Sequence, residues 1–364
     1  MNYSKYFISI FIITTIFLLL SCNNGVKKEE VKGLKEYASF PIGTAIKIKT
    51  LLKDTQLQKL QKSNFNSITS ASDMKMNSIM PKEGVYSWEI VDSIVNYAQK
   101  NKQRLFGHNL IWHSSTPKWV QEKASKDSLW LGTFMKEYIT KYVTRYKGKV
   151  AAWDVVNEGL ESHGGEVRKT IWYNTIGKDY IAKAFQYAHE ADPEAILFYN
   201  DFNIERDTLK LNSTLNMIKE LQAKGVPISG LGFQMHIRMD TPDEVIANSL
   251  KKAVKTGLQI HISELDIIFN KHDDTRGGGI QVYQKLTDEM KQEQAKKYKS
   301  IVEIYKNIVP KEQQYGITFW DFTDRDSWIN GFFNLNDWPT IFDKNLQHKP
   351  AYFGFLEGLK EKSK

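Results

Sequence analysis

Eight short apolar or alternating segments recur along the chain, separated by longer stretches with helical periodicity. The short segments span residues 40–46, 65–69, 104–112, 150–156, 195–199, 231–236, 259–263 and 315–320. The helical stretches span residues 51–61, 89–100, 129–146, 180–191, 208–224, 242–255 and 292–308, and Pro350 opens a last short one. Eight successive strand–helix units predict an α/β protein with a single TIM (β/α)8 barrel.

Such a barrel carries its active site at the C-terminal ends of the strands. Polar and aromatic residues that could bind or react gather at these positions of the sequence. They are Asp73, Lys75, His108, Trp112, His113, Asn157, Glu158, Asn200, Asp201, Gln234, His236, Glu264, Asp266, Trp320 and Asp321. Because strand interiors in a barrel are apolar, this clustering predicts a functional site at that end.

Two glutamates stand out among these residues. Glu158 follows the fourth predicted strand and Glu264 follows the seventh. Strands four and seven lie across the mouth of a barrel, so both carboxyl groups would face one cleft. Two carboxyl groups on either side of a sugar linkage are the requirement for glycoside hydrolysis. A single Asn-Glu pair could be a rim salt bridge, but two glutamates on these strands favour catalysis.

The N-terminal segment has the features of an export signal. Residues 1–6 contain one lysine, and residues 7–20 form an apolar run too short to span a membrane comfortably. Residues 19–22 resemble a bacterial lipobox, in which the sole cysteine, Cys22, is lipidated. We expect a signal peptide at 1–21, a polar tether at 22–38 and the barrel at 39–364. An ordinary signal peptide with an incidental cysteine is the alternative.

The remaining composition limits partners and cofactors. The formal net charge is +8, but the lysines are scattered rather than clustered with aromatic residues, so we expect no nucleic-acid partner. We expect membrane contact through the lipid anchor only, on the outer membrane, the cell surface or the periplasmic side. The sequence gives no sign of a cofactor, and it lacks the His-x-His and His-Glu-x-x-His patterns of metal sites. Nine tryptophans fit either a large core or a groove for sugar rings.

Several motifs together resemble glycoside hydrolase family 10, whose typical members are endo-β-1,4-xylanases. The resemblance covers residues 40–356 and is carried by residues 107–113, 153–158, 199–203, 232–236, 262–267, 318–328, 342–343 and 349–352. It implies retaining, internal cleavage of β-1,4-xylosidic bonds in xylan, with Glu158 as general acid/base and Glu264 as nucleophile. It also implies that His236 and Asp266 support Glu264. Substrate binding would fall to Lys75, His108, Trp112, Asn157, Gln234, His236, Trp320 and Trp328.

The chain departs from the family pattern beside the catalytic residues. The usual Glu-Asn-x-Met-Lys-Trp motif is Ala71-Ser72-Asp73-Met74-Lys75-Met76 here, and Ser115 replaces a usual glutamine. An aspartate, Asp321, stands where glycine is common. These changes predict an altered sugar subsite, for which Arg276 and Arg325 could supply replacement contacts.

Three alternatives remain open from the sequence. The same mechanism could act on a different or heavily decorated β-glycan. An inactive surface lipoprotein could bind glycans without cutting them, although both glutamates are intact. A metal-dependent barrel hydrolase could use His108, His113, His236 and Asp266.

Overall fold

The computed structural model describes residues 32–360. The predicted signal peptide, Cys22 and the first part of the predicted tether lie outside the described residues. Inside this range, none of the helices combines the length and the apolar character needed to cross a membrane. The short 3-10 helix η1 (Leu34–Glu36) packs its buried Leu34 against the barrel, and the Leu34 amide donates to Asn64 Oδ1 at 3.3 Å.

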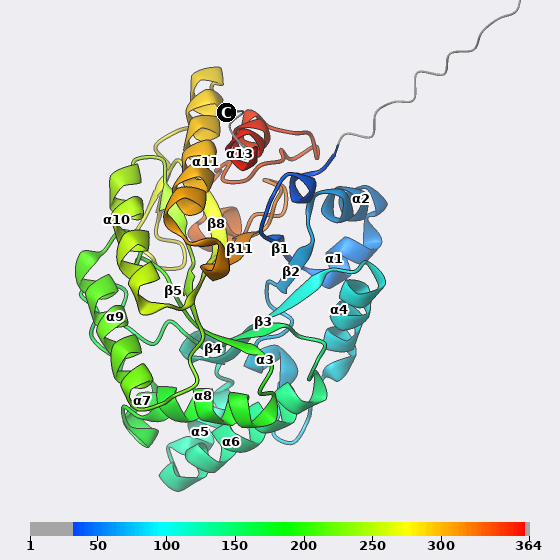
Figure 1. The fold of residues 1–364 in the computed structure, drawn as a ribbon. Coiled ribbons are helices and arrows are strands. Elements are labelled where there is room, and N and C mark those ends of the chain that lie inside the picture. Colours follow the sequence, from blue (N-terminus) through cyan, green and yellow to red (C-terminus); the bar gives the residue numbers. More distant parts are fainter. Residues whose placement is uncertain (1–31, 361–364) are drawn as a thin grey trace, which may run out of the picture. The chain divides into compact units, whose positions relative to one another are not determined.

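Eight parallel strands close into a barrel, which confirms the predicted fold (Figure 1). The last strand, β11, pairs with both β1 and β8 and so leaves no free edge between them. The barrel strands are β1 (Ile42–Ile46), β2 (Ser67–Ser70), β3 (Arg104–Trp112), β4 (Ala152–Asn157), β5 (Ile196–Asp201), β6 (Gly230–Phe233), β8 (Gln259–Ile268) and β11 (Gln314–Phe319).

Helices surround this barrel, and several begin at capping side chains. Asp127, Asp207 and Thr287 accept hydrogen bonds from first-turn amides of α6, α9 and α11. The longer helices are α2 (Thr55–Asn64), α4 (Trp88–Lys100), α6 (Ser128–Arg145), α8 (Tyr180–Ala191), α9 (Thr208–Ala223), α10 (Asp243–Ala253), α11 (Asp288–Ile308) and α13 (Pro350–Leu359). The shorter ones are α1 (Ile48–Lys53), α3 (Met76–Ile79), α5 (Lys118–Ala124), α7 (Ile171–Ile176) and α12 (Trp328–Phe333).

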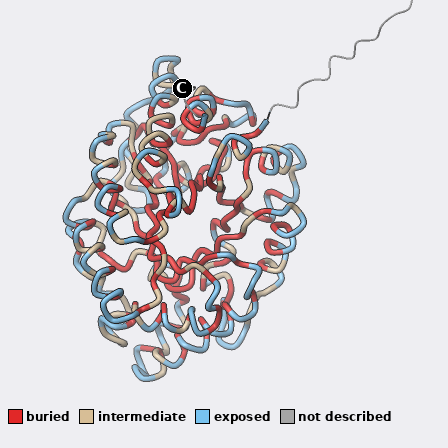
Figure 2. The backbone as a smooth tube through the Cα atoms, in the orientation of Figure 1, coloured by how far each residue is buried: buried red, intermediate tan, exposed pale blue. Residues whose placement is uncertain are grey.

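The barrel interior is filled by side chains rather than open. Buried residues follow the ring of strands, and exposed residues lie on the outer sides of the helices (Figure 2). Inside the ring, Phe106, Phe198 and Tyr315 pack around His261, with ring centroids 4.7 to 5.8 Å apart. Glycine is required at Gly230, because a Cβ there would lie 2.3 Å from the Phe198 ring. His261 also contacts Thr318 Oγ1 at 2.8 Å.

Two predicted elements are broken, for identifiable backbone reasons. The predicted strand at 231–236 divides into β6 and β7 (His236–Arg238), because Met235 adopts a left-handed φ of 62°. The predicted helix at 51–61 is divided between α1 and α2, because the backbone of Asp54 is extended. The Asp54 carboxylate caps α2 by accepting a hydrogen bond from Leu57 N at 2.9 Å. Strand β8 continues beyond residue 263 by pairing with β7, and so contains Glu264 and Asp266. A small hairpin of β9 (Lys271–His272) and β10 (Gly279–Ile280) follows it.

Candidate active site

A cleft of about 610 Å³ opens at the C-terminal ends of the barrel strands. All ten residues to which the family resemblance assigns catalysis or substrate binding line it together. They are Lys75, His108, Trp112, Asn157, Glu158, Gln234, His236, Glu264, Trp320 and Trp328. His113 and Asp321 line it as well. Asp266 lies behind His236, outside the lining. The fold therefore gathers side chains from every part of the barrel into one site.

Glu158 is held at the end of β4 by three donors. Its backbone adopts a left-handed φ of 56°, and its amide donates to the Asn200 carbonyl at 2.9 Å. Trp112 Nε1 donates to one carboxylate oxygen at 2.8 Å. Gln234 Nε2 and Asn157 Nδ2 donate to the other at 3.0 and 3.3 Å. The carboxylate is thus fixed in orientation while it remains partly exposed to the cleft.

Glu264 lies within β8 and is only 4% exposed. Asn200 Nδ2 donates to one carboxylate oxygen at 2.8 Å, and His236 Nε2 donates to the other at 3.3 Å. Burial alone would raise the pKa of this carboxyl. The electrostatic interaction with His108, the hydrogen bond and charge of His236, and the charge of Lys75 outweigh burial and lower the pKa below its ordinary value. Glu264 is therefore an ionised carboxylate at neutral pH.

His236 lies between Glu264 and a second carboxylate. Its Nδ1 donates to Asp266 Oδ2 at 2.9 Å, and Trp328 Nε1 donates to the same oxygen at 2.8 Å. Burial works against a charged ring, but Asp266 and Glu264 raise the pKa of His236 to about 10. The ring is thus a cation that donates through both nitrogens.

Buried amides connect the two glutamates. Asn200 Nδ2 donates both to Glu264 and to Asn157 Oδ1, the latter at 2.9 Å, and Asn157 in turn donates to Glu158. Ser263 Oγ fixes the Asn200 side chain by donating to its Oδ1 at 2.7 Å. The sequence showed Asn200 at a strand end without assigning it a role. Its place in the 199–203 motif was the available signal.

Lys75 and His108 lie among the tryptophans of the cleft wall. Lys75 Nζ is 4.6 Å from the Trp112 ring and 5.6 Å from the Trp320 ring. Burial lowers the pKa of Lys75, although the carboxylates of Glu264 and Glu158 oppose this effect. Burial likewise lowers the pKa of His108 to about 3, so that its ring is neutral. This ring contacts Asp154 Oδ2 at 2.8 Å.

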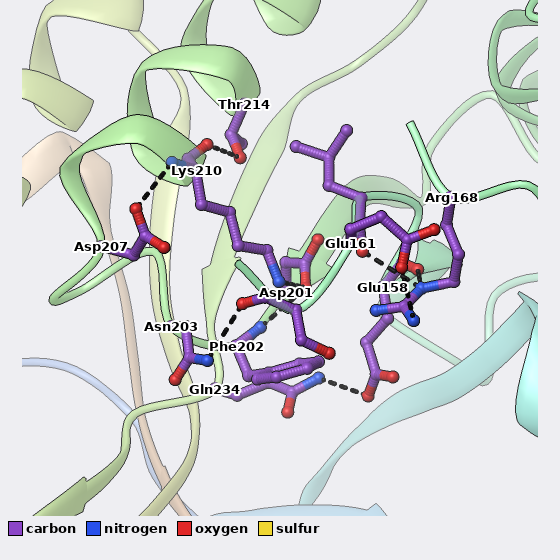
Figure 3. Close-up of polar contacts among 12 residues, drawn as sticks. Glu158, Glu161, Arg168, Asp201, Phe202, Asn203, Asp207, Lys210, Thr214 and Gln234 are labelled. Carbon is purple, nitrogen blue, oxygen red and sulfur yellow. Dashed lines mark hydrogen bonds and ion pairs between the residues drawn. The ribbon is translucent and has the colours of Figure 1, made fainter. Parts of the chain in front are cut away.

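A buried ion pair lies under one wall of the cleft (Figure 3). Lys210 is fully buried, and its Nζ is 2.7 Å from Asp201 Oδ1 and 3.9 Å from the ring of Phe202, which lines the cleft. Tyr199 OH donates to the other Asp201 oxygen at 2.6 Å. The sequence did not reveal this pair, because Lys210 falls in an amphipathic helix pattern where lysine is normally exposed.

The residues that depart from the family pattern are not all in the cleft. Ala71 and Ser72 line it, but Ser115 does not. Ser115 is buried, and its hydroxyl donates to the Trp112 carbonyl at 3.3 Å, which corrects the expectation that it builds the subsite. Arg276 lines the cleft, 4.8 Å from the Phe332 ring. Arg325 instead pairs with Asp54 at 3.0 Å, outside the cleft lining.

The histidines considered as metal ligands have other partners. His108 contacts Asp154, and His236 contacts both Glu264 and Asp266. Across residues 32–360, no three His, Cys, Asp or Glu side chains converge as a metal ion would require.

The chain is similar to known proteins over most of its length. Residues 32–358 match the family model of glycosyl hydrolase family 10. The endo-1,4-beta-xylanase B of Thermotoga neapolitana is 37% identical, over 96% of this chain and 97% of that protein. The beta-1,4-xylanase of Dictyoglomus thermophilum is 37% identical, over 95% of this chain and 98% of that protein. A Cellvibrio japonicus xylanase10C mutant, solved in complex with xylopentaose, superimposes with a TM-score of 0.84 at 34% identity, covering 91% of this chain and 69% of that one.

Proposed function

The chain belongs to glycosyl hydrolase family 10, and on that basis we propose that it is a retaining endo-1,4-β-xylanase. The observation that carries the proposal is the pair Glu158 and Glu264, which face one cleft and are held by different partners. The relatives named above as xylanases match almost the whole chain, which supports xylan as the substrate.

The two glutamates suit different steps of a double displacement. In the first step, Glu264 attacks the anomeric carbon while Glu158 donates its proton to the departing glycosidic oxygen. In the second step, Glu158 takes a proton from water, and the water oxygen displaces Glu264 from the sugar. Inversion at each step returns the original anomeric configuration.

The partners of Glu264 prepare it to act as the nucleophile. The cationic ring of His236 keeps the carboxylate ionised and fixes one oxygen. Asn200 fixes the other, so the side chain cannot rotate away from the cleft. Lys75, His108, Asn157 and Gln234 supply polar groups for the sugar hydroxyls, and Trp112, Trp320 and Trp328 supply ring faces.

The substrate is tested with the purified full chain on xylan, β-glucan and mannan, by reducing-end release and product sizing. Wild type should release xylooligosaccharides of several lengths from xylan, and Glu264→Ala should release none. Glu312→Gln is the matched control, because Glu312 is exposed and lies in η4 (Lys311–Gln313), before β11. Equal or greater activity on another glycan, or no product from any of them, would contradict the proposal.

The roles are tested by azide rescue on an aryl xyloside with a good leaving group. In Glu264→Ala, azide attacks directly from the vacated side, so the xylosyl azide should have the opposite anomeric configuration. In Glu158→Ala, azide attacks the enzyme-bound ester, so the azide product should keep the original configuration. The reverse pattern would exchange the two roles.

We further propose that the enzyme is exported and anchored to a bacterial membrane through lipidated Cys22. The support is the lipobox-like segment at residues 19–22 after an apolar run. Cells expressing the full chain should incorporate labelled palmitate into it, and Cys22→Ser should abolish the label and release the protein from the membrane fraction. Wild-type protein without label would favour an ordinary signal peptide.

A further inference from the structure

We propose that Asp321 and Lys47 bind the second sugar on the side of the cleft that keeps the covalently held unit, and so determine specificity for chain length. The proposal rests on the xylanase function given above. The ligand is an unsubstituted xylosyl unit, recognised through two neighbouring hydroxyl groups.

The position of this pair follows from the roles of the two glutamates. Glu158 serves the departing oxygen, so the departing part lies toward the β4 and β5 loops, where Phe202 lines the wall. The retained sugar contacts Glu264 and lies among Lys75, His108 and the tryptophans. Beyond it, the ends of β1, β2 and β11 line the cleft with Lys47, Ala71, Ser72 and Asp321. Asp321 is near enough for its charge to act on Lys75.

The Asp321 carboxylate is only half used by the protein. The residue follows Trp320 with a left-handed φ of 60°. Its Oδ2 accepts the Trp328 amide at 3.0 Å and lies 3.6 Å from Lys47 Nζ. Its Oδ1 has no hydrogen-bond partner among residues 32–360. This oxygen is not fully enclosed, so a ligand in the cleft can reach it. Capping the start of α12 does not by itself explain why Asp321 is placed here. Ser327 Oγ already caps that helix by accepting a hydrogen bond from Ile329 N at 3.3 Å.

Lys47 complements this acceptor with a donor. Its ammonium group donates to the Asp326 carbonyl at 2.8 Å, and its side chain is 41% exposed. An ammonium group has three donors, so others remain for a ligand. One sugar hydroxyl can donate to Asp321 Oδ1 while its neighbour accepts from Lys47.

Ser72, Asn77 and Ser78 add neutral polar side chains to this end of the cleft, but few charged groups other than Asp321 and Lys47 lie there to bind a sugar. Ala71 offers only a methyl group, which packs against Trp320. Arg325 is paired with Asp54 and Asp326. Asp321 and Lys47 thus supply the charged contacts at the position where the family motif is altered.

The test compares 4-nitrophenyl β-xyloside with 4-nitrophenyl β-xylobioside, which differ by one sugar on the retained side. The readout is the ratio of kcat/KM for the xylobioside to kcat/KM for the xyloside. Asp321→Gly should lower this ratio by about tenfold or more, since a hydrogen bond to a charged group is lost. Glycine tolerates the left-handed backbone, so this variant should fold. Asp321→Asn keeps an acceptor and should lower the ratio less, and Lys47→Met should lower it severalfold.

The matched control is Glu312→Gln, at an exposed residue outside the cleft lining, which should leave the ratio unchanged. Thermal unfolding of each variant checks that it is folded. An unchanged ratio in Asp321→Gly, or equal losses on both substrates, would overturn the proposal while leaving the xylanase function intact. A wild type inactive on xylan and on both aryl substrates would overturn the xylanase function itself.

Discussion

Replacing His236 with glutamine should remove a charge that stabilises the folded protein in a defined pH range. In the folded state, Asp266 and Glu264 raise the pKa of His236 from 6.5 to about 10. At 1.36 kcal/mol per pH unit, this corresponds to about 5 kcal/mol of favourable interaction. The side chain is 12% exposed, so solvent screens this interaction only slightly.

The sign follows from the direction of the pKa change. The pKa of His236 is higher in the folded state than in the unfolded chain. The stabilisation that the protonated ring gives the folded state is therefore complete below pH 6.5. It is then lost as the pH rises toward 10, at up to about 1.4 kcal/mol per pH unit. Groups that do not contact His236 titrate alike in wild type and His236→Gln. The difference in their free energies of unfolding therefore reports on His236 together with Glu264 and Asp266, the two carboxylates that it contacts.

The assay is urea unfolding of wild type and His236→Gln between pH 6 and 10. Wild type should be more stable at pH 6, and the difference should shrink steadily toward pH 10. NMR titration of the His236 ring in the folded protein gives the pKa directly. A constant stability difference across this range, or a measured pKa near 6.5, would refute the reasoning.

Three further predictions concern the acid, the buried ion pair and metal dependence. Glu158→Gln should lower kcat/KM on xylan by roughly 10² to 10⁴, but much less on a dinitrophenyl xylobioside, whose leaving group needs no proton; equal losses would argue against an acid role. Lys210→Met should cost about 3–5 kcal/mol in urea unfolding because it leaves Asp201 buried and unpaired. Adding Asp201→Asn to Lys210→Met should recover part of that loss. A Lys210→Met variant as stable as wild type would contradict this account. Xylan hydrolysis should persist in excess chelator, whereas loss that is restored by added metal would contradict the proposed mechanism.

Local sequence patterns were sufficient for the barrel and for the principal site residues. Strand and helix periodicity depends on neighbours within a few residues, so the eight-unit alternation was readable directly. A barrel fixes which ends of the strands face the cleft, and this made Glu158 and Glu264 identifiable. Backbone breaks at Asp54 and Met235 were not readable, because a single left-handed or extended residue leaves the surrounding pattern unchanged.

The electrostatics of the site were decided by tertiary structure. Sequence alone cannot show that Lys210 is fully buried under Phe202, that Ser115 turns to a backbone carbonyl, or that Asp321 lies beside Lys47. The charge of His236 likewise depends on two carboxylates brought within hydrogen-bonding distance by the pairing of β7 and β8. Local patterns in the chain were enough to identify the chemical groups at the mouth of the barrel. Their burial and their partners could be known only from the folded molecule, because desolvation and charge–charge interactions depend on distances between residues far apart in the chain.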